Sequence, residues 1–309
     1  MGCLWASALS QNTSVCLLLK NAAALSQYPG YIRHQFSSGQ QLDTELPAAL
    51  ASSLAPGSIE RLLLCCKAQD AAAAINSVAH TLTPESVIVL LQNGFAFQQE
   101  LTAKRPPATV FCLSTSAGAW LRAPFVITPA GQGQSWLGHL NTDHQTLCDQ
   151  RANELLAELP AQAMNIVFEP AMTTRLWQKL AVNCAINALT VVHDCHNGEL
   201  LTRPEAFTQL QALTEEIIRL YAQLPQTPEL PHLQQTVQAV AAGTAENISS
   251  TLQDVRRGRQ TEIDHLNGFL VHLAQQHNLP CPLNLEVLQA VHARIRGVNL
   301  KRNPPPCRM

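Results

Sequence analysis

The sequence has no long apolar run and little charge. A membrane-spanning helix needs about 18 or more consecutive apolar residues, and no segment of the 309-residue chain reaches that length. Charged residues make up 14% of the chain and the formal net charge is −2, so neither nucleic acid nor a membrane surface would be attracted electrostatically. We therefore expect neither as a partner.

The ten cysteines lack the spacing of metal ligands or of a disulfide framework. No Cys-x-x-Cys pair occurs, and Cys65, Cys112 and Cys184 stand inside apolar runs. Such cysteines are typical of buried, reduced thiols in the cytosol, and the missing spacing predicts no metal site. The N-terminus also lacks the charged start and cleavage site of a signal peptide. We therefore expect a cytoplasmic protein.

The chain is built from two halves of different character. Before Pro170, apolar β-forming runs alternate with helical stretches, which predicts a parallel sheet covered on both faces. After Pro170 every long segment shows the spacing of an amphipathic helix. The expected strands are 14–20, 61–67, 86–93 and 108–115, with shorter ones at 125–129 and 135–140, and the expected helices are 4–9, 68–82, 142–159, 173–194, 204–224, 232–255, 261–277 and 284–295.

This pattern predicts an α/β domain over residues 1–167 and an all-helical domain over residues 168–309. The proline-rich tail from about residue 301 is expected to be disordered. Such a plan is common among nicotinamide-dependent dehydrogenases, but a fold analogy alone shows no function.

A polar stripe interrupts the apolar segment LWQKLAVNCAIN. Lys179, Asn183 and Asn187 follow one another at intervals of four residues, so they lie within about 80° on one helix face. Lysine is almost never buried without a partner, and an unmatched buried polar group costs roughly 1–3 kcal/mol. The stripe therefore faces either a ligand or a polar seam against the other domain, and the spacing alone does not separate the two.

A second polar cluster lies in AENISSTLQDVRRGRQTEIDHLNG. Asn247 and Ser250 are three residues apart and would share a helix face. Glu262 would point about 120° away from Ser250 on a straight helix, so a common site requires a break, for which Gly258 is suited. The alternative is a solvated charged helix with Asn247 as its N-cap, and charge runs usually mark such a surface.

Two further residues follow predicted strands. Lys67 ends LLLCCK and Asn93 ends VIVLLQN. In open α/β sheets ligands bind at the carboxyl ends of the strands. Lysine suits a phosphate, and an Asn-Gly turn brings backbone close to a bound group. Taken singly, each could also be an ordinary loop residue.

These segments together resemble the 2-dehydropantoate 2-reductase (ketopantoate reductase) family. The likeness is strongest in LWQKLAVNCAINALT, NGELL and AENISSTLQDVRRGRQTEIDHLNGFL, and weaker in LLLCCKAQD, LLQNG and STSAGA. The resemblance implies NADPH-dependent reduction of ketopantoate to pantoate in pantothenate and coenzyme A biosynthesis. It also implies an oxidoreductase acting on a small molecule, as a monomer or a homodimer.

The resemblance also implies roles for matching residues. Lys179 would be the general acid at the C2 carbonyl oxygen, and Glu262 would hold the substrate's hydroxyl. The substrate-binding residues would be Asn183, Asn187, Asn247 and Ser250, and the cofactor-binding residues Gly2, Lys20, Lys67, Asn93 and Ala117. Lys20 falls where the family places a basic residue for the 2′-phosphate of NADPH. The helical domain would close over the nucleotide domain and exclude water from the hydride.

The chain departs from the family at its start. Members begin with a strand that runs into a GxGxxG loop, whereas Gly2 aligns with the last glycine of that loop and only Met1 precedes it. We thus expect a Rossmann-like domain without its first strand and most of its glycine loop. A misplaced start at an internal methionine of the loop would explain this, and the codons upstream would decide it.

Two alternatives follow from these observations. The chain could reduce a different 2-keto or hydroxy acid, because related hydroxyacid dehydrogenases also carry a KLxxN helix. It could also be a truncated protein that binds its ligands weakly or has lost activity, because the phosphate cradle is incomplete. The retained set of Lys179, Asn183, Ser250 and Glu262 argues against decay.

Overall fold

The computed structural model describes residues 1–131, 133–160 and 163–302. The chain divides into two compact units, the first made of Met1–Gln92 and Phe97–Thr173 and the second of Asn93–Ala96 with the chain from Thr174 onward. The sequence placed the change of domain between residues 167 and 168. The first unit extends slightly further, because Met172 packs so tightly on Gly138 that a Cβ there would stand 2.8 Å from the Met172 Cβ.

The first unit is the α/β half, and its elements alternate along the chain. In order they are α1 (Gly2–Leu9), β1 (Leu17–Leu19), α2 (Ala22–Ser26), β2 (Tyr31–Gln35), β3 (Gln41–Glu45), β4 (Ala48–Leu50), η1 (Ala51–Ser53), β5 (Ile59–Leu64), α3 (Ala68–Val78), η2 (Ala79–Thr81), β6 (Leu82–Leu90), α4 (Ala96–Lys104), β7 (Val110–Thr115), β8 (Ala119–Ala123), β9 (Val126–Pro129), β10 (Ser135–Gly138), α5 (Gln145–Glu158) and β11 (Ile166–Phe168).

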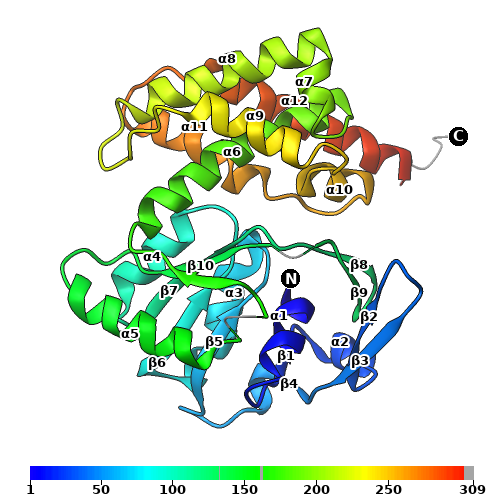
Figure 1. Cartoon of the computed structure of the whole chain (residues 1–309), viewed down its shortest axis with the longest axis vertical. Coiled ribbons are helices and arrows are strands. Elements are labelled where there is room, and N and C mark those ends of the chain that lie inside the picture. The colour runs from blue at the N-terminus through cyan, green and yellow to red at the C-terminus, as the bar shows by residue number, and fades with distance from the viewer. Residues whose placement is uncertain (132, 161–162, 303–309) are drawn as a thin grey trace, which may run out of the picture. The chain divides into compact units, whose positions relative to one another are not determined.

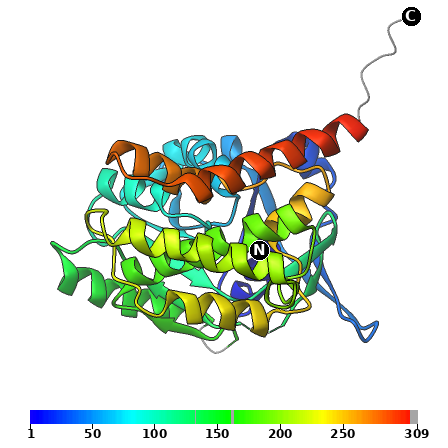
Figure 2. The same cartoon turned by 90° about the horizontal axis from the view of Figure 1, so that it is seen from above.

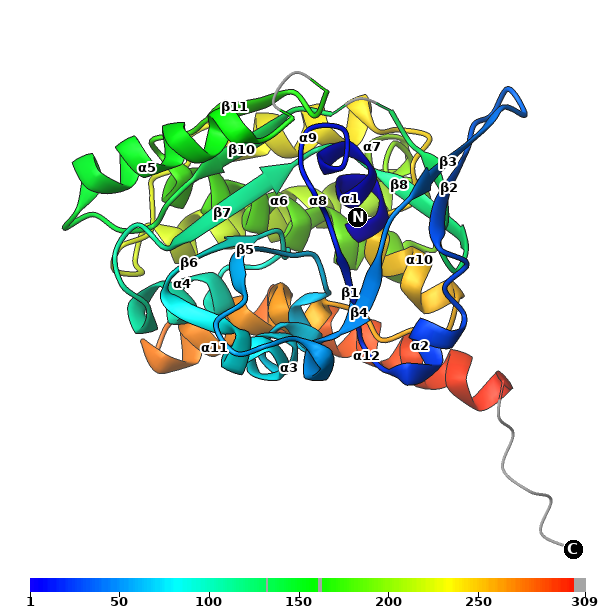
Figure 3. The same ribbon diagram turned by 90° about the horizontal axis from the view of Figure 1, so that it is seen from below.

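The main sheet has five strands in the order β11-β10-β7-β6-β5 (Figure 3). Strands β5, β6 and β7 are parallel, as the sequence predicts, whereas β10 is antiparallel to β7. The expectation of a wholly parallel sheet is therefore wrong at β10. A parallel return needs a crossover of a dozen or more residues, usually a helix, and the chain between β7 and β10 forms strands β8 and β9 instead.

Two smaller sheets complete the unit. Strand β1 pairs with β4 in parallel, and a four-stranded sheet runs in the order β3-β2-β9-β8. Among the described residues β1 pairs only with β4, and β5 only with β6, so no ladder joins the β1–β4 pair to the main sheet. The expectation that the domain lacks the family's first strand stays a prediction. Helix α1 packs into the core through Trp5, which is fully buried with Phe111 and Leu137.

The second unit is helical throughout its described part, as the sequence predicts (Figures 1 and 2). Helix α12 packs against α8 and α11, and α8 packs against α9. The elements are α6 (Met172–His193), α7 (Glu199–Thr202), α8 (Pro204–Tyr221), α9 (Leu233–Gly243), α10 (Ser250–Arg256), η3 (Ile263–His265), α11 (Asn267–Gln276) and α12 (Pro282–Arg302).

Three helix predictions in this unit are corrected. The single helix expected over 232–255 is two helices, α9 and α10, because the chain leaves the helix at Thr244 and restarts at a Ser249 cap. Helix α11 begins at Asn267 rather than at residue 261, after the short turn η3. Residues 301–302, expected in the disordered tail, end α12; the rest of that tail, 303–309, lies outside the described residues.

A buried carboxylate from α8 holds the start of α12. Glu216 is 4% exposed and accepts hydrogen bonds from the backbone N–H groups of Leu283 and Asn284, both at 2.8 Å, and from the Asn284 side chain at 2.9 Å. A carboxylate at a helix N-terminus satisfies donors that have no partner within the helix and interacts favourably with the helix dipole. Glu216 therefore fixes where α12 begins.

We expect Glu216→Ala to lower the free energy of unfolding by about 2–4 kcal/mol, because two buried donors and one partly buried donor lose a charged acceptor. Urea unfolding followed by far-UV circular dichroism measures this. The matched control is Glu215→Ala, because the neighbouring Glu215 is solvent-exposed and only approaches Arg219 at 3.5 Å. A loss for Glu216→Ala no larger than for this control would contradict the capping role.

Candidate active site

Helix α6 carries the polar stripe that the sequence predicts. Lys179 and Asn183 are half-buried, and Asn187 is 8% exposed. The apolar neighbours Leu180, Ala181 and Cys184 are buried. Arg175, one turn before Lys179, extends the stripe by a second cation. Sequence reasoning missed Arg175, although its spacing of four residues from Lys179 was a usable signal.

The environment of Lys179 changes its acidity. The pKa of Lys179 is lowered to about 8 in total: burial lowers it most, the Glu262 carboxylate raises it and the Arg175 guanidinium lowers it. A charged group that loses water favours its neutral form unless an opposite charge lies near. Lys179 can therefore exchange a proton near neutral pH, as a catalytic acid must.

Glu262 reaches the stripe from a separate segment. It is 9% exposed and lies just before η3, at the end of the stretch that follows α10. Helix α10 ends at Arg256, and Gly258 adopts a φ of +63°, so the break expected near Gly258 is present. The alternative of a solvated charged helix is also wrong for α10, most of whose residues are buried.

Asn93 also belongs to this group of residues. Its Nδ2 donates to Glu262 Oε2 at 3.2 Å. Gly94 has a φ of +98°, and a Cβ there would stand 3.1 Å from the His265 carbonyl oxygen. The Phe95 ring lies 4.6 Å from the Trp177 ring, centroid to centroid. These contacts fix Asn93 against the helical unit, and the cofactor role implied for it by resemblance stays a prediction.

Asn247 and Ser250 do not share a helix face, which corrects the sequence expectation. Asn247 lies in the turn before α10, where its N–H donates to the Thr244 carbonyl at 2.8 Å. The N-cap is Ser249, whose Oγ accepts from Leu252 N at 3.1 Å, so the expected Asn247 cap is also wrong. Ser250 is the first residue of α10, and both predicted residues are exposed.

The remaining predicted residues, except Ala117, lie near the carboxyl ends of β1 and β5. Lys20 follows β1, and its Nζ lies 3.2 Å from Asp70 Oδ1 in the first turn of α3. Lys67 follows β5 and is the N-cap of the same helix. Gly2 begins α1, and a Cβ there would stand 3.5 Å from the Cβ of Cys65, which is an ordinary contact. Gly2 is thus not required for close packing.

Ala117 stands apart from that group, between β7 and β8. Its backbone N–H donates to Thr115 Oγ1 at 3.0 Å. Its implied place in cofactor binding stays a prediction.

If Lys20 binds the 2′-phosphate, as the resemblance implies, Lys20→Ala should weaken NADPH binding about tenfold through loss of one charged bond, and leave NADH binding unchanged. The exposed pair with Asp70 contributes only about 0–1 kcal/mol, so a phosphate can displace it. Fluorescence titration with both nucleotides tests this. Lys104→Ala, at a similarly exposed lysine paired with Glu100, is the control. An equal loss of affinity for NADPH and NADH would show that Lys20 does not bind the 2′-phosphate.

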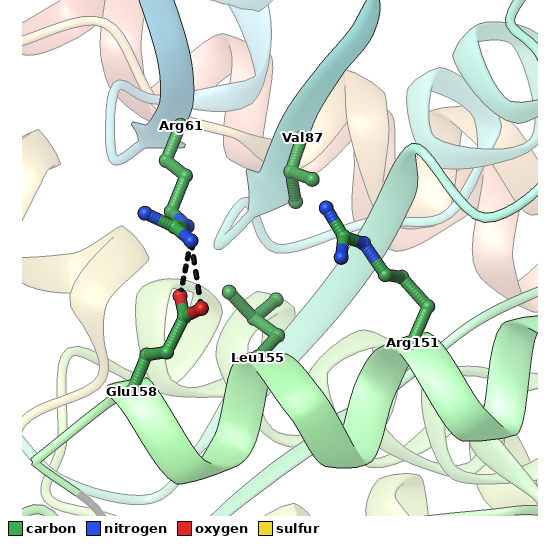
Figure 4. Close-up of a pocket in the computed structure, with 5 residues that line it drawn as sticks. All are labelled: Arg61, Val87, Arg151, Leu155 and Glu158. Atoms are coloured by element: carbon green, nitrogen blue, oxygen red, sulfur yellow. Dashed lines mark hydrogen bonds and ion pairs between the residues drawn. The ribbon is translucent and has the colours of Figure 1, made fainter.

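A small cavity lies elsewhere in the first unit, between β5, β6 and α5 (Figure 4). It is lined by Arg61, Val87, Arg151, Leu155 and Glu158. Arg61 pairs with Glu158 at 2.7 Å and Arg151 with Glu154 at 2.8 Å. The cavity contains none of the predicted site residues, and both guanidinium groups already have carboxylate partners.

Across the described ranges, no group of three or more His, Cys, Asp or Glu side chains could hold a metal ion. Within the same ranges, none of the helices is both long and apolar enough to span a bilayer.

The chain matches two family models over most of its length. The model described as "Ketopantoate reductase PanE/ApbA" matches residues 1–142, and "Ketopantoate reductase PanE/ApbA C terminal" matches residues 171–295. The first match covers the α/β half as far as β10 and ends before α5 and β11, and the second covers α6 and nearly all of the helical half.

Two curated proteins with similar sequences carry the name of the same family. The 2-dehydropantoate 2-reductase of Escherichia coli O157:H7 is 34% identical over 74% of this chain and 72% of its own. That of Yersinia pestis is 31% identical over 82% and 78%.

Solved structures share the fold at lower identity. D-mandelate dehydrogenase in complex with NADH and anilino(oxo)acetate has a TM-score of 0.84 at 21% identity, covering 97% of this chain and 96% of its own. A PanE/ApbA family ketopantoate reductase from Ralstonia eutropha JMP134 has a TM-score of 0.82 at 21% identity, covering 96% of each chain. With these folds and the identities of the sequence relatives, the chain belongs to the ketopantoate reductase family.

Proposed function

We propose that this chain reduces 2-dehydropantoate to pantoate with NADPH, a step of pantothenate and coenzyme A biosynthesis. Its relatives at 31% and 34% identity carry the name of this activity. The observation that carries the proposal is Lys179, a half-buried lysine beside Glu262 whose pKa is lowered to about 8.

Lys179 supplies the proton in this reaction. Reduction converts the C2 carbonyl to a secondary alcohol, which requires a hydride at carbon and a proton at oxygen. As negative charge develops on the oxygen, the Lys179 ammonium stabilises it and then transfers its proton from Nζ. A lysine with a pKa near 8 gives up that proton more readily than one at the ordinary value of 10.5.

The neighbouring polar residues orient the substrate. Asn183 and Asn187 continue the stripe from Lys179 along α6, and Ser250 begins α10. Amide and hydroxyl groups suit the carboxylate and hydroxyl oxygens of a small hydroxy acid. We assign the substrate's hydroxyl to Glu262, whose carboxylate is an acceptor already held by Asn93.

The first unit suits a phosphorylated dinucleotide. Lys20 and Lys67 both stand at the carboxyl ends of parallel strands, joined through the first turn of α3, where α/β sheets bind such ligands. NADPH bound there supplies the hydride. In this proposal Lys20 binds the 2′-phosphate of NADPH, and Lys67 faces the phosphate groups of the cofactor.

The substrate is a small molecule, and we place the protein in the cytoplasm as a monomer or a homodimer. No disulfide joins cysteines within the described ranges, which suits a reducing compartment. A ketopantoate reductase from Staphylococcus aureus with the same fold is described as dimeric, with a TM-score of 0.70.

The test is NADPH oxidation with a panel of 2-keto acids. The purified chain should show its highest kcat/KM with 2-dehydropantoate, compared with pyruvate and phenylglyoxylate. A strong preference for another acid would show that the chain is a 2-keto acid reductase with a different substrate. No reduction of any acid by a folded chain that binds NADPH would overturn the activity.

A further inference from the structure

A buried hydroxyl pair connects the two substrate-binding segments of the helical unit. Thr190, on α6, is fully buried, and its Oγ1 lies 2.6 Å from the Oγ of Ser249, the N-cap of α10. Thr190 follows Asn187 by three residues, and Ser249 directly precedes Ser250. The pair therefore joins the stripe of α6 to the start of α10.

The directions of the hydrogen bonds follow from the number of protons. Thr190 Oγ1 donates to the Asn187 carbonyl at 2.8 Å, which uses its only proton. Ser249 must therefore donate in the 2.6 Å contact, while its Oγ accepts from Leu252 N at 3.1 Å. The donors thus follow one order, from Leu252 to Ser249, to Thr190 and to the Asn187 carbonyl, and both hydroxyl protons have an acceptor.

The segment before α10 is held a second time, by the loop after α6. Asn197 N donates to the Asn247 carbonyl at 2.9 Å, and Gly198 N donates to the Ala245 carbonyl at 3.1 Å. A Cβ at Gly198 would stand 2.6 Å from the Ala245 Cβ, so this approach requires glycine. The turn carrying Asn247 is thus fixed at one end by this loop and at the other by Ser249.

We propose that Thr190 and Ser249 are positioning residues that set the affinity for the hydroxy-acid substrate by holding Ser250 and Asn247 at a fixed place relative to Asn187. Neither hydroxyl is needed to touch the substrate, since both protons are used inside the protein. This inference rests on the proposed function. Without the pair, the segment Asn247–Ser250, whose two end residues are exposed, gains freedom that binding must then remove, which weakens affinity.

The test replaces the hydroxyl without changing the shape of the side chain. Thr190→Val should raise the KM for 2-dehydropantoate about tenfold, while kcat stays within about threefold and the NADPH Kd is unchanged. Thr190→Ser, which keeps the hydroxyl, should stay within about twofold of wild type. A KM for Thr190→Val equal to that of wild type, or an equal loss in Thr190→Ser, would overturn the proposal.

Thr214→Val is the matched control. Thr214 is also fully buried in a helix of the same unit, and its Oγ1 donates to the Leu210 carbonyl at 2.7 Å. The change removes the same group but touches neither segment, so its KM should equal that of wild type. A KM increase as large as that of Thr190→Val would mean that any buried threonine loss has this effect.

Ser249→Ala tests the pair from its other end. It should raise the KM to a similar extent, and it decides the question if Thr190→Val fails to fold. The double variant should be no worse than Ser249→Ala, because that change already removes the contact with Thr190 together with the cap bond to Leu252. Independent, multiplying effects would contradict a shared role. A wild-type chain inactive with 2-dehydropantoate refutes the proposed function instead, so the two failures are distinguishable.

Discussion

Lys179→Ala should lower kcat by about 10²–10⁴-fold while the chain stays folded, because positioned acid catalysis is typically worth that much. The side chain is half-buried and its pKa is about 8, so alanine removes a group whose charged form is disfavoured there. Alanine also favours a helix. Steady-state kinetics with 2-dehydropantoate give kcat, and far-UV circular dichroism checks the fold.

The pH profile identifies the group that donates the proton. Only the ammonium form of Lys179 can act as acid, so wild-type kcat should fall about tenfold per pH unit above a pH of about 8. This high-pH limb, the decrease in kcat above a pH of about 8, should be absent from the profile of Lys179→Ala. Lys104→Ala, at an exposed lysine of α4, should match wild type in both measurements. Near-normal turnover in Lys179→Ala would remove Lys179 from the acid's role.

The stripe on α6 was predictable from sequence because it is a local pattern. Lys179, Asn183 and Asn187 repeat every four residues within one uninterrupted helix, and helical geometry alone puts them on one face. The assignment of function, in contrast, came from resemblance. The same spacing also allowed a polar seam between domains, and geometry within one helix cannot separate those alternatives.

The N-cap of α10 was not predictable in the same way. Asn247, Ser249 and Ser250 stand within four residues, and asparagine and serine have nearly equal capping preference. The structure uses Ser249, which also bonds to Thr190, 59 residues away in the chain. A choice among near-equal local options was thus decided by a distant partner.

The contact between Asn93 and Glu262 shows a similar limit. The two residues are 169 positions apart, and no local pattern relates them. The hairpin β2–β3 was missed for another reason. Strand β3, Gln41–Glu45, has no buried residue, so it lacks the apolar alternation by which half-buried strands are found.

Glu262→Gln should move the high-pH limb of kcat to lower pH and lower kcat at pH 8 about 10–100-fold. The Lys179 pKa of about 8 reflects lowering by burial and by Arg175 against raising by Glu262. Removing the raising contribution of Glu262 leaves the lowering ones, so the pKa of Lys179 falls below 8. Less Lys179 is then protonated at pH 8, and under the proposed function the substrate's hydroxyl also loses its charged acceptor.

Two further variants test this expected shift, one as a control and one with the opposite expected effect. Asp264→Asn removes an exposed carboxylate two residues further along, one that pairs with His292 at 2.8 Å, and should leave the limb in place. Arg175→Gln should move the limb to higher pH, because it removes a contribution that lowers the Lys179 pKa. Opposite shifts from Glu262→Gln and Arg175→Gln would identify one titrating group between two charges. An unmoved limb in both would mean that the proton comes from elsewhere, even if Lys179→Ala is inactive.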